Sequence, residues 1–539
     1  MAGFREHSGC RWNFGLVGMI LVMVMVKFTS AVPIPAPDLP DNCNSEERCC
    51  MPRPYRGKPV RQFEYDPTLP VRFRRAAHLI DEEYIAKLER GVKLQRELPD
   101  TDPRSWTNQM NLHCLYCDNG LYYPNQTWPL EVHNGWLFLP WHRMFMYFNE
   151  RILAKLLDDD TFALPFWNWD NQTPEEPHAN ILPYFYARNK TSSLWNKNRN
   201  NCSEPPLTID LNTEGGCTTK TPEELRIQNN RLIYTQIVTG APTSNLFFGM
   251  PYSYGDAGAT GAGTFEDNPH GTVHFWLGDP NPEKPAGPFD DMGNFGVAAR
   301  DPAFYGHHVN IDRIWTIWKT LPGAQRKEPT HPDFLDAQFT FYDENADLVI
   351  VNVSQTLNRT LLRYEYEEMP AAWTTNGELA GQENNVTLCN PATAAETTAM
   401  IGAADYFSPD TVFFKDPITF RVARPAVRNS TGVEVLEFSG VDFAEPSMQV
   451  HWRSYLFYPT AVTGTSAACP EFAGAYNYVA HPGMAIFKGR NRKWRVALDS
   501  KLVALGKQNL SDIVVTLAQF GPTIQPVQFA KVEITYDTS

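Results

Sequence analysis

Apolar residues spaced three and four positions apart indicate helices in the first two thirds of the chain. One such pattern starts at Arg74 and predicts a helix. Its apolar positions are Ala76, Ala77, Leu79, Ile80, Tyr84, Ile85 and Leu88. A second helix is expected over about Pro140–Leu157, because Pro is favoured in a first helical turn, and a third over about Gly306–Lys319. Residues 160–300 contain Pro and Gly throughout and are expected to be rich in loops.

The pattern changes near residue 370, where short alternating segments replace the helical spacing. Apolar alternation or short β-branched runs occur in Val527–Tyr536, Lys493–Leu498 and Asp512–Leu517, and turn residues separate them. That combination is typical of an antiparallel sandwich. Residues 367–400 are rich in Thr, Ala and Asn, and are expected to form an exposed linker.

The two patterns together predict an α+β protein. We expect a mainly helical, loop-rich domain with a four-helix bundle core over residues 32–366, the linker over 367–400, and a C-terminal antiparallel β-sandwich over 401–539. A length of 539 residues fits two or three domains, and 42% apolar residues leave room for a sizeable core. The net charge of -14 argues against nucleic acid as a partner, because phosphate binding needs clustered Lys and Arg.

The N-terminus has the layout of a cleavable signal peptide. Arg5 and Arg11 precede the apolar run Phe14–Val26, and small residues and a Pro-rich stretch follow it. The run is short for a membrane span. We therefore expect residues 1–31 to be removed and the mature protein not to stay inserted in a membrane; the alternative is an uncleaved anchor.

Sequons and cysteines favour the same secretory route. Nine N-x-[ST] sequons begin at Asn125, Asn171, Asn189, Asn201, Asn352, Asn358, Asn385, Asn429 and Asn509. Ten cysteines, one of them inside the presumed signal peptide, leave nine, and an oxidising compartment would pair most of them. The odd number means that at least one has other chemistry. We expect a vacuolar or extracellular destination rather than a plastid.

Several of the 13 histidines form local groups. The groups are His113, His133 and His142; His270 and His274; and His307 and His308. His270 and His274 are four residues apart, so on a helix they lie on one face and can bind one ion. His133 and His142 are nine apart and would lie on opposite faces of one helix. If both bind one metal, His133 must lie in the preceding loop, and Gly135 permits that break.

The chemistry of these groups favours copper among other metals. The sequence contains no HExxH motif, and the groups lack the paired thiolates of a structural zinc site. Neutral imidazoles suit copper, and two sites with three histidines each leave coordination positions open for O2.

The segments around the histidines carry a family resemblance. They are HCLYC (His113–Cys117), NGWLFLPWHRMF (Asn134–Phe145), LPFWNWD (Leu164–Asp170), NPHGTVHFWLGD (Asn268–Asp279) and DMGNFGVAARDPAFYGHHVNIDRIW (Asp291–Trp315). In these segments the sequence resembles the plant polyphenol oxidases, a type-3 dicopper family that includes catechol oxidases and tyrosinases and shares its dicopper helices with hemocyanins. The resemblance extends from about Asn42 to the C-terminus and is weaker after residue 370.

The resemblance implies a ligand set for two copper ions. The first copper would be bound by His113, His133 and His142, and the second by His270, His274 and His308. His307 would pack beside the site. Cys117 matches the family cysteine that forms a thioether to the second ligand, here His133.

The resemblance also implies disulfides near the N-terminus. Cys114 matches a disulfide half whose expected partner is Cys49, with Cys43–Cys50 beside it. The remaining cysteines are left to pair by elimination, as Cys202–Cys217 and Cys389–Cys469.

The implied activity is the oxidation of catechols to o-quinones, with O2 reduced to water. Phe295 aligns with the aromatic gate over the second copper, although core packing would also explain it. Glu266 matches a glutamate that, with an asparagine, is proposed to hold a water for deprotonating monophenols. Gly271 stands where that asparagine is expected, which favours diphenols over monophenols. The alternatives are a tyrosinase or specialised phenolic hydroxylase, and a hemocyanin-like O2 carrier.

The C-terminal region resembles the domain that covers the active site in latent family members. The aromatic-rich segment FAGAYNYVAH (Phe472–His481) and the closing strands fit that domain. We expect latency that a protease relieves by cutting between about Glu367 and Asp405. Small phenols, O2 and that protease are then the expected partners.

Overall fold

The computed structural model describes most residues from position 32 onward. The described residues are 32–37, 49, 60–118, 120, 128–281, 289–323, 325–375, 392–413, 415–429, 431–445, 448–479 and 491–539. They belong to one unit that spans Val32–Ser539. The expected signal peptide lies outside the described residues. No helix within the described ranges is long and apolar enough to cross a membrane.

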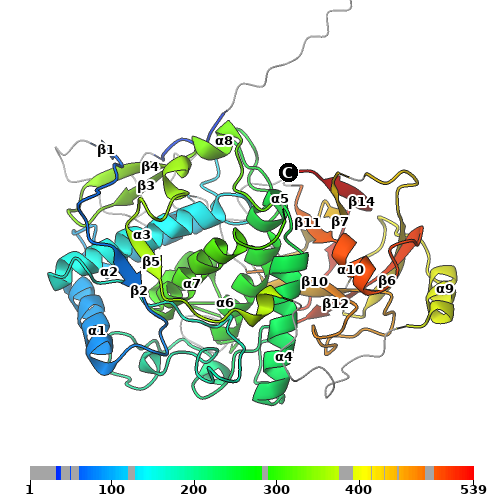
Figure 1. Ribbon diagram of the computed structural model, residues 1–539, viewed down its shortest axis with the longest axis horizontal. Coiled ribbons are helices and arrows are strands. Elements are labelled where there is room, and N and C mark those ends of the chain that lie inside the picture. The colour runs from blue at the N-terminus through cyan, green and yellow to red at the C-terminus, as the bar shows by residue number, and fades with distance from the viewer. Residues whose placement is uncertain are drawn as a thin grey trace, which may run out of the picture. The chain divides into compact units, whose positions relative to one another are not determined.

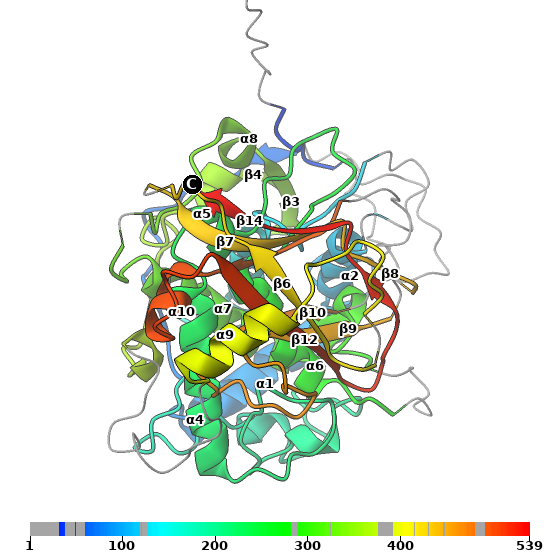
Figure 2. The ribbon, with the colours of Figure 1, turned by 90° about the vertical axis from the view of Figure 1, so that its right-hand side faces the viewer.

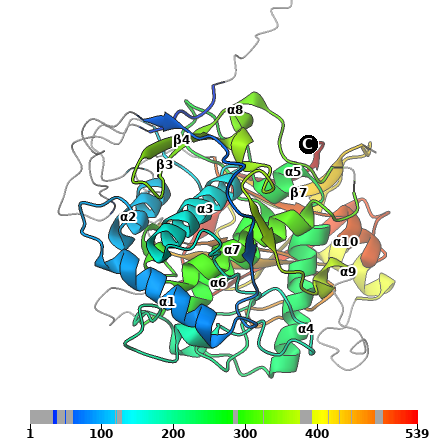
Figure 3. The same cartoon turned by 60° about the vertical axis from the view of Figure 1, so that its left-hand side comes forward.

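Helices dominate the N-terminal two thirds (Figure 1). They are α1 (Glu82–Glu97), α2 (Trp106–Cys117), α3 (Phe138–Leu157), α4 (Pro222–Ile233), α5 (Ser244–Phe248), α6 (Gly271–Leu277), α7 (Ala303–Trp318) and α8 (Pro332–Leu335). Short 3-10 or π segments are η1 (Tyr184–Tyr186), η2 (Asn201–Ser203), η3 (Tyr234–Thr239), η4 (Glu266–His270), η5 (Phe295–Arg300), η6 (Val353–Thr356) and η7 (Ala372–Thr374). Helix α3 packs against both α1 and α7 (Figure 3).

The first helix begins later than its apolar spacing predicted. Asp81 caps α1 by accepting a hydrogen bond from the backbone N–H of Tyr84, so the helix starts at Glu82. The residues just before it form strand β2 (Arg72–Arg74), which pairs in parallel with β5 (Tyr364–Tyr366). The predicted start at Arg74 is therefore wrong, because that stretch is held by a strand from the far end of the domain.

Helices α3 and α7 lie where the sequence predicted them, within three residues at their N-terminal ends. Every residue of α3 from Phe138 to Ala154 is buried. A helix that is buried on all sides belongs to the interior of a large domain. It is therefore a central element around which the other helices pack.

A buried ion network ties β2 and β5 to these helices. The carboxylate of Glu150 in α3 accepts hydrogen bonds from Arg72 at 2.7 Å and from Arg74 at 2.9 Å. Arg74 also lies 3.2 Å from Asp312 in α7, and Tyr364 donates to the same Asp312 oxygen at 2.6 Å. All these side chains are buried, so each charge depends on its partners.

A small sheet in the same part was not predicted from the sequence. It has the order β1-β4-β3, made from β1 (Arg61–Gln62), β3 (Gln338–Tyr342) and β4 (Leu348–Asn352). The last two strands form an antiparallel pair.

The C-terminal part is an antiparallel β-sandwich, as predicted (Figure 2). One sheet has the order β10-β9-β12-β6 and the other β11-β7-β14. The strands are β6 (Ile418–Ala423), β7 (Val433–Ser439), β9 (Val450–Leu456), β10 (Phe472–Tyr478), β11 (Lys493–Ala497), β12 (Asp512–Phe520) and β14 (Lys531–Asp537). The remaining elements are the small pair β8 (Asp442–Phe443) and β13 (Val527–Gln528), and the helices α9 (Ala394–Ala403) and α10 (Asp499–Ala504). Trp452, Phe438 and Val515 are among the residues of one core that both sheets share.

The sandwich packs directly on the helical part. Strand β10 contacts η4 and α6. Phe472 and Ala475 of β10 belong to the same apolar cluster as the helical core. The surface between the two parts is therefore buried. The domain boundaries predicted from the sequence stay predictions, and α9 begins within the predicted linker.

Candidate metal centre

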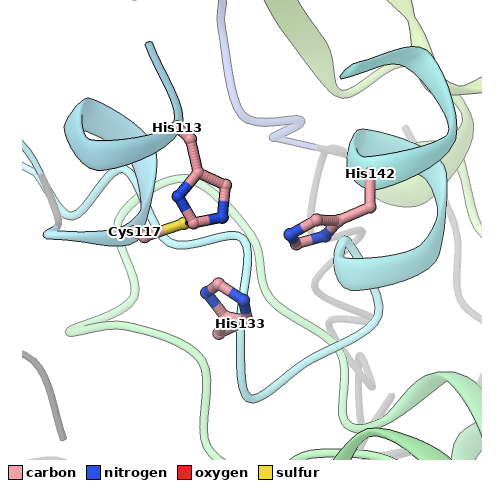
Figure 4. A group of neighbouring side chains, drawn as sticks. All are labelled: His113, Cys117, His133 and His142. Atoms are coloured by element: carbon pink, nitrogen blue, oxygen red, sulfur yellow. The ribbon is translucent and has the colours of Figure 1, made fainter. Parts of the chain in front are cut away.

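Three histidines from three separate segments meet in a first group (Figure 4). His113 lies in α2, His142 lies in α3, and His133 lies in the loop before α3, where the nine-residue spacing predicted it. One ring nitrogen of each histidine and the Sγ atom of Cys117 all lie within 4.8 Å of one another. All four side chains are buried.

A backbone contact fixes the protonation of His142. Its Nδ1 atom lies 2.8 Å from the carbonyl oxygen of Phe138, and because a carbonyl only accepts, Nδ1 carries the proton. The lone pair is therefore on Nε2, which is buried and has no hydrogen-bond partner among the described residues. Burial lowers the pKa of His142 to about 3, so the ring is neutral near pH 7. A neutral imidazole with an unused lone pair is suited to binding a metal ion.

Cys117 is the one described cysteine outside a disulfide. Its sulfur lies 3.3 Å from Nε2 of His113 and within 4.8 Å of a ring nitrogen of His133. The expected thioether joins this sulfur to His133, and it stays a prediction.

A second group brings together histidines from η4, α6 and α7. His270 ends η4, His274 lies in α6, and His307 and His308 lie in α7. One ring nitrogen of each lies within 4.8 Å of the others. The Nε2 atoms of His274 and His308 are 3.2 Å apart, so both are directed at the same point.

Backbone carbonyls orient two rings of this group as well. Nδ1 of His270 donates to the carbonyl of Glu266 at 3.0 Å, and Nδ1 of His274 donates to the carbonyl of Met292 at 2.7 Å. Both rings therefore present Nε2 as the lone-pair atom. Burial lowers the pKa of His274 to about 4 and that of His270 well below its ordinary value. Both are neutral, as metal binding requires.

The neighbouring pair in α7 is distinguished by one hydrogen bond. The indole N–H of Trp169 donates to Nδ1 of His307 at 3.0 Å, so this nitrogen accepts and the ring proton is on Nε2. Neither nitrogen of His307 then offers a lone pair to a metal. The ring of His308 faces His274, and the geometry therefore favours His308 as the third ligand of the group.

The two groups form a single buried centre. The rings of His142 and His308 stack with centroids 4.4 Å apart at 15°, and those of His133 and His270 lie 6.2 Å apart at 21°. The described donors are imidazoles, with one thiol at the edge. Such a donor set, in which Nε2 of His142 and of His270 has no hydrogen-bond partner among the described residues, fits two copper ions.

Phe295 lies against this centre, at the start of η5. Its ring stacks on His133 with centroids 4.2 Å apart at 9°, and meets His274 edge-on at 5.0 Å. The ring therefore contacts a histidine of each group. Its role as a gate stays a prediction.

Glu266 is buried beside the loop that carries His133. Its Oε1 atom accepts a hydrogen bond from the backbone N–H of Asn134 at 2.7 Å. The other oxygen, Oε2, is buried and has no hydrogen-bond partner among the described residues. Burial is the main cause that raises the pKa of this carboxyl well above its usual range. The structure thus supplies one carboxyl group at the centre that can exchange a proton.

Gly271 faces the C-terminal sandwich. A Cβ atom at this position would lie 3.3 Å from Cβ and 3.4 Å from the carbonyl oxygen of Asn477 in β10. The amide of Asn477 donates to the hydroxyl of Thr272 at 2.6 Å. The absent side chain of Gly271 therefore gives β10 its close approach to α6.

Two polar residues of the sandwich were missed by sequence reasoning. Asn477 contacts α6 between His270 and His274, and Gln449 donates to the carbonyl of Gly293 at 2.6 Å. Gly293 follows Met292, whose carbonyl orients His274. Asn477 lies inside a segment singled out for its aromatic residues, and its amide was the overlooked signal.

Two disulfides have both of their cysteines among the described residues, Cys49–Cys114 and Cys202–Cys217. Cys43, Cys50 and Cys389 lie outside the described residues. Cys469 is also disulfide-bonded. The first disulfide joins the N-terminal arm to α2, in the turn next to His113.

Three family models match consecutive parts of the sequence. The common central domain of tyrosinase matches residues 103–321, which include all the histidines of both groups. The polyphenol oxidase middle domain matches residues 328–377. The chloroplastic polyphenol oxidase C-terminal domain matches residues 412–536, which include the sandwich strands.

A curated relative corrects the predicted destination. The chloroplastic polyphenol oxidase of Vitis vinifera is 39% identical over 512 residues, which cover 90% of this chain and 79% of that protein. Relatives from Prunus armeniaca and Solanum tuberosum are also named chloroplastic. The expectation of a vacuolar or extracellular protein that is not plastid-directed is therefore wrong, and the relatives indicate a plastid. Short sequons and an apolar run are weaker evidence of a protein's destination than relatives that align with most of the chain.

Solved structures of latent enzymes share the fold over both parts. Latent apple tyrosinase has a TM-score of 0.76 and 32% identity, and covers 89% of this chain and 100% of its own. Latent aurone synthase has a TM-score of 0.78 and 28% identity, and covers 94% of this chain and 99% of its own. With two adjacent histidine groups that suit copper, the chain is a type-3 dicopper protein and belongs to the polyphenol oxidase family.

Proposed function

We propose that this protein oxidises o-diphenols to o-quinones while O2 is reduced to water. The observation that carries the proposal is the pair of histidine groups in one buried centre against Phe295. The proposed ligands are His113, His133 and His142 for one copper and His270, His274 and His308 for the other. Copper bound there supplies the electron exchange between the phenol and O2.

The residues around the centre position the phenol and exclude water. The ring of Phe295 offers an aromatic face for stacking next to both histidine groups. Phe304 packs on the rings of His308 and His113 at 4.1 and 4.8 Å, so the far side of the centre is apolar. The ionised form of Glu266 is the proposed acceptor, through Oε2, for a hydroxyl proton of the phenol.

Diphenols are the preferred substrates in this proposal. The position after His270 is Gly271, which has no side chain to help deprotonate a monophenol. A catechol already carries both oxygen atoms of the quinone. Its oxidation therefore depends less on a side chain that deprotonates a monophenol before its ring is hydroxylated. The second candidate is monophenol hydroxylation, which is favoured by Oε2 of Glu266, an oxygen with no hydrogen-bond partner among the described residues.

The C-terminal sandwich is proposed to keep the intact protein latent. Asn477 and Gln449 bind the two segments that hold His274, and the apolar core continues across the contact. A substrate needs this surface to open. Proteolysis between about Glu367 and Asp405 would free the sandwich from the helical part.

The test uses copper-loaded protein, intact and after trimming by a protease in that interval. We expect two copper ions per protein molecule, rapid quinone formation from a simple catechol after trimming, and slower turnover of the matching monophenol. Reversible O2 binding without quinone would show a hemocyanin-like carrier instead. Equal specific activity of the intact and trimmed forms would contradict latency, and efficient hydroxylation of the monophenol would show that Gly271 does not disfavour monophenols.

A further inference from the structure

A cavity of about 410 Å³ lies outside the histidine centre. The side chains that characterise it are Trp106, Trp195, Arg96, Lys197, Arg300 and Asp291. They come from separate segments of the helical part: α1, α2, η5 and two loops. The volume lies in the range of small-molecule sites.

Charge in this cavity is opposite to that of the whole protein. The protein has a net charge of -14, yet three cationic side chains line the cavity beside one carboxylate. That carboxylate, Asp291, accepts hydrogen bonds from the amides of Asn196 at 2.7 Å and Asn198 at 3.1 Å. Burial raises its pKa, which favours the neutral form. Arg96 has no carboxylate partner among the described residues, and its charge can therefore attract an anion into the cavity.

Aromatic side chains in the cavity favour a ligand that also contains a flat ring. The guanidinium of Arg96 lies over the ring of Trp106, 4.5 Å from its centroid. Among the described residues, Arg96 forms no ion pair with a carboxylate. Trp195 is half-buried and supplies a second indole. A flat ring that carries an anionic group can stack on an indole while its charge meets the guanidinium.

We propose that this cavity is a second ligand site, separate from the dicopper centre, that binds small aromatic carboxylates. It is not part of the proposed oxidation and stands without it. Residues that line the cavity nevertheless belong to the segments that position both histidine groups. Trp106 starts the helix that carries His113, and Asp291 precedes Met292, whose carbonyl orients His274.

The experiment measures binding of cinnamate to the intact, copper-free protein by calorimetry and tryptophan fluorescence. Cinnamyl alcohol supplies the ring without the charge, and inorganic phosphate supplies an anion without the ring. We expect cinnamate to bind at least tenfold more tightly than either. Equal binding of cinnamyl alcohol would overturn the role of charge, and equal binding of phosphate would overturn the role of the ring.

Two matched variants on α1 locate the site. Arg96→Gln removes the cation over Trp106, whereas Lys93→Gln removes an exposed cation of the same helix that does not line the cavity. We expect at least a fivefold loss of cinnamate affinity in Arg96→Gln and no change in Lys93→Gln. Unchanged binding in Arg96→Gln would place cinnamate elsewhere, including the histidine centre, and overturn the proposal. Because no turnover is measured, the result is independent of whether the protein oxidises catechols.

Discussion

His307 and His308 are neighbours in one helix, yet their nitrogens have different partners. Trp169 occupies Nδ1 of His307, while Nε2 of His308 faces His274. Sequence order alone leaves the two equivalent. A single indole N–H distinguishes them, because it determines the position of the ring proton.

Replacing each member of the pair tests that distinction. His308→Ala is expected to remove the second copper and to lower quinone formation by more than about 100-fold. His307→Gln, which keeps an acceptor for Trp169, is expected to retain both metals and to stay within about tenfold of the parent activity. Copper per protein molecule and the rate with a catechol are the measurements. Loss of one copper in His307→Gln, with His308→Ala fully loaded, would reverse the assignment.

Cys117 is expected to become covalently joined to His133 in the mature enzyme. The two side chains lie in the same group of potential ligands, so the bond needs little movement. Peptide mass mapping of the copper-loaded protein exposed to O2 should show the two peptides cross-linked and lighter by two hydrogens. Cys117→Ser should show them separate. Two separate peptides in the parent protein would contradict the thioether.

At the scale of elements, a few buried charges join segments that are distant in sequence. Glu150 of α3 binds both arginines of β2, and Asp312 of α7 binds one of them. The pairing of β2 with β5 brings Tyr364 into this network. The closing strand of the helical part is thereby held on its central helices.

Breaking this network should destabilise the fold strongly. Glu150→Gln leaves two buried guanidinium groups short of charge and is expected to cost about 3–5 kcal/mol of unfolding free energy. The control Glu82→Gln disrupts the ion pair with Arg188, in which the carboxylate side chain is 67% exposed, and should leave the unfolding free energy nearly unchanged because solvent screens the pair. Chemical denaturation of both variants checks the difference. Comparable losses would show that the buried network contributes no more than a surface pair.

The elements differ in how far sequence predicts them. The helices α3 and α7 lie where the sequence predicted them, because apolar residues recur along both at helical spacing. The start of α1 does not, since Ala76 and Ile80 have helical spacing but lie before the Asp81 cap. Tertiary contacts hold this stretch instead. Arg72–Arg74 pair with β5, a partner almost 300 residues away, and Ala76 bridges to Phe166, and no local pattern contains either contact.

At the scale of the whole molecule, the surface at which the C-terminal sandwich docks on the helical part contains a buried histidine. Nδ1 of His451 in β9 lies 3.1 Å from the amide oxygen of Asn477, and Nε2 lies 3.2 Å from that of Gln449. Its ring packs on Phe275 of α6 and Phe520 of β12. Burial, together with the charge of Arg453 on the same strand, lowers the pKa of His451 to about 3.

Docking of the sandwich is therefore expected to weaken in acid. When docking is broken, His451 returns toward its ordinary pKa of 6.5. Above pH 6.5 the ring of His451 is neutral in both states, and the docking free energy has its full value. As the pH falls from 6.5 toward 3, the undocked ring binds a proton that the docked ring does not, and docking weakens. The loss approaches about 1.4 kcal/mol per pH unit. Hydrogen exchange of β10 against pH measures it, and His451→Gln should flatten the profile; an unchanged profile in that variant would assign the effect to other groups.

A polar contact at the same surface offers a test at neutral pH. Asn477→Ala removes the hydrogen bond to Thr272 and should weaken docking by about 1 kcal/mol. The intact protein should then oxidise catechol several-fold faster. The control Asn429→Ala changes an exposed loop of the sandwich and should leave the rate unaltered. If both variants match the parent, Asn477 does not contribute to latency.

The centre and the presence of a covering domain could be predicted from the sequence, whereas the polar residues by which that domain contacts the helical part could not. His270 and His274 are recognisable because a helix places residues four apart on one face. Phe295 and Glu266 were found through their position in a family motif. Asn477 and Gln449 reach the centre only through tertiary docking of a separate domain, and nothing in their local sequence indicates the helix that they contact.

Gly271 links two properties that would otherwise evolve separately. The residue that is proposed to favour diphenols by lacking a side chain also makes room for β10. A change to Asn that is meant to broaden the substrate range would press on the backbone of Asn477 and loosen the cover at the same time. A variant at this position that gains monophenol activity in the intact protein could therefore owe the gain to altered chemistry or to premature activation. A comparison of the trimmed enzymes separates the two effects.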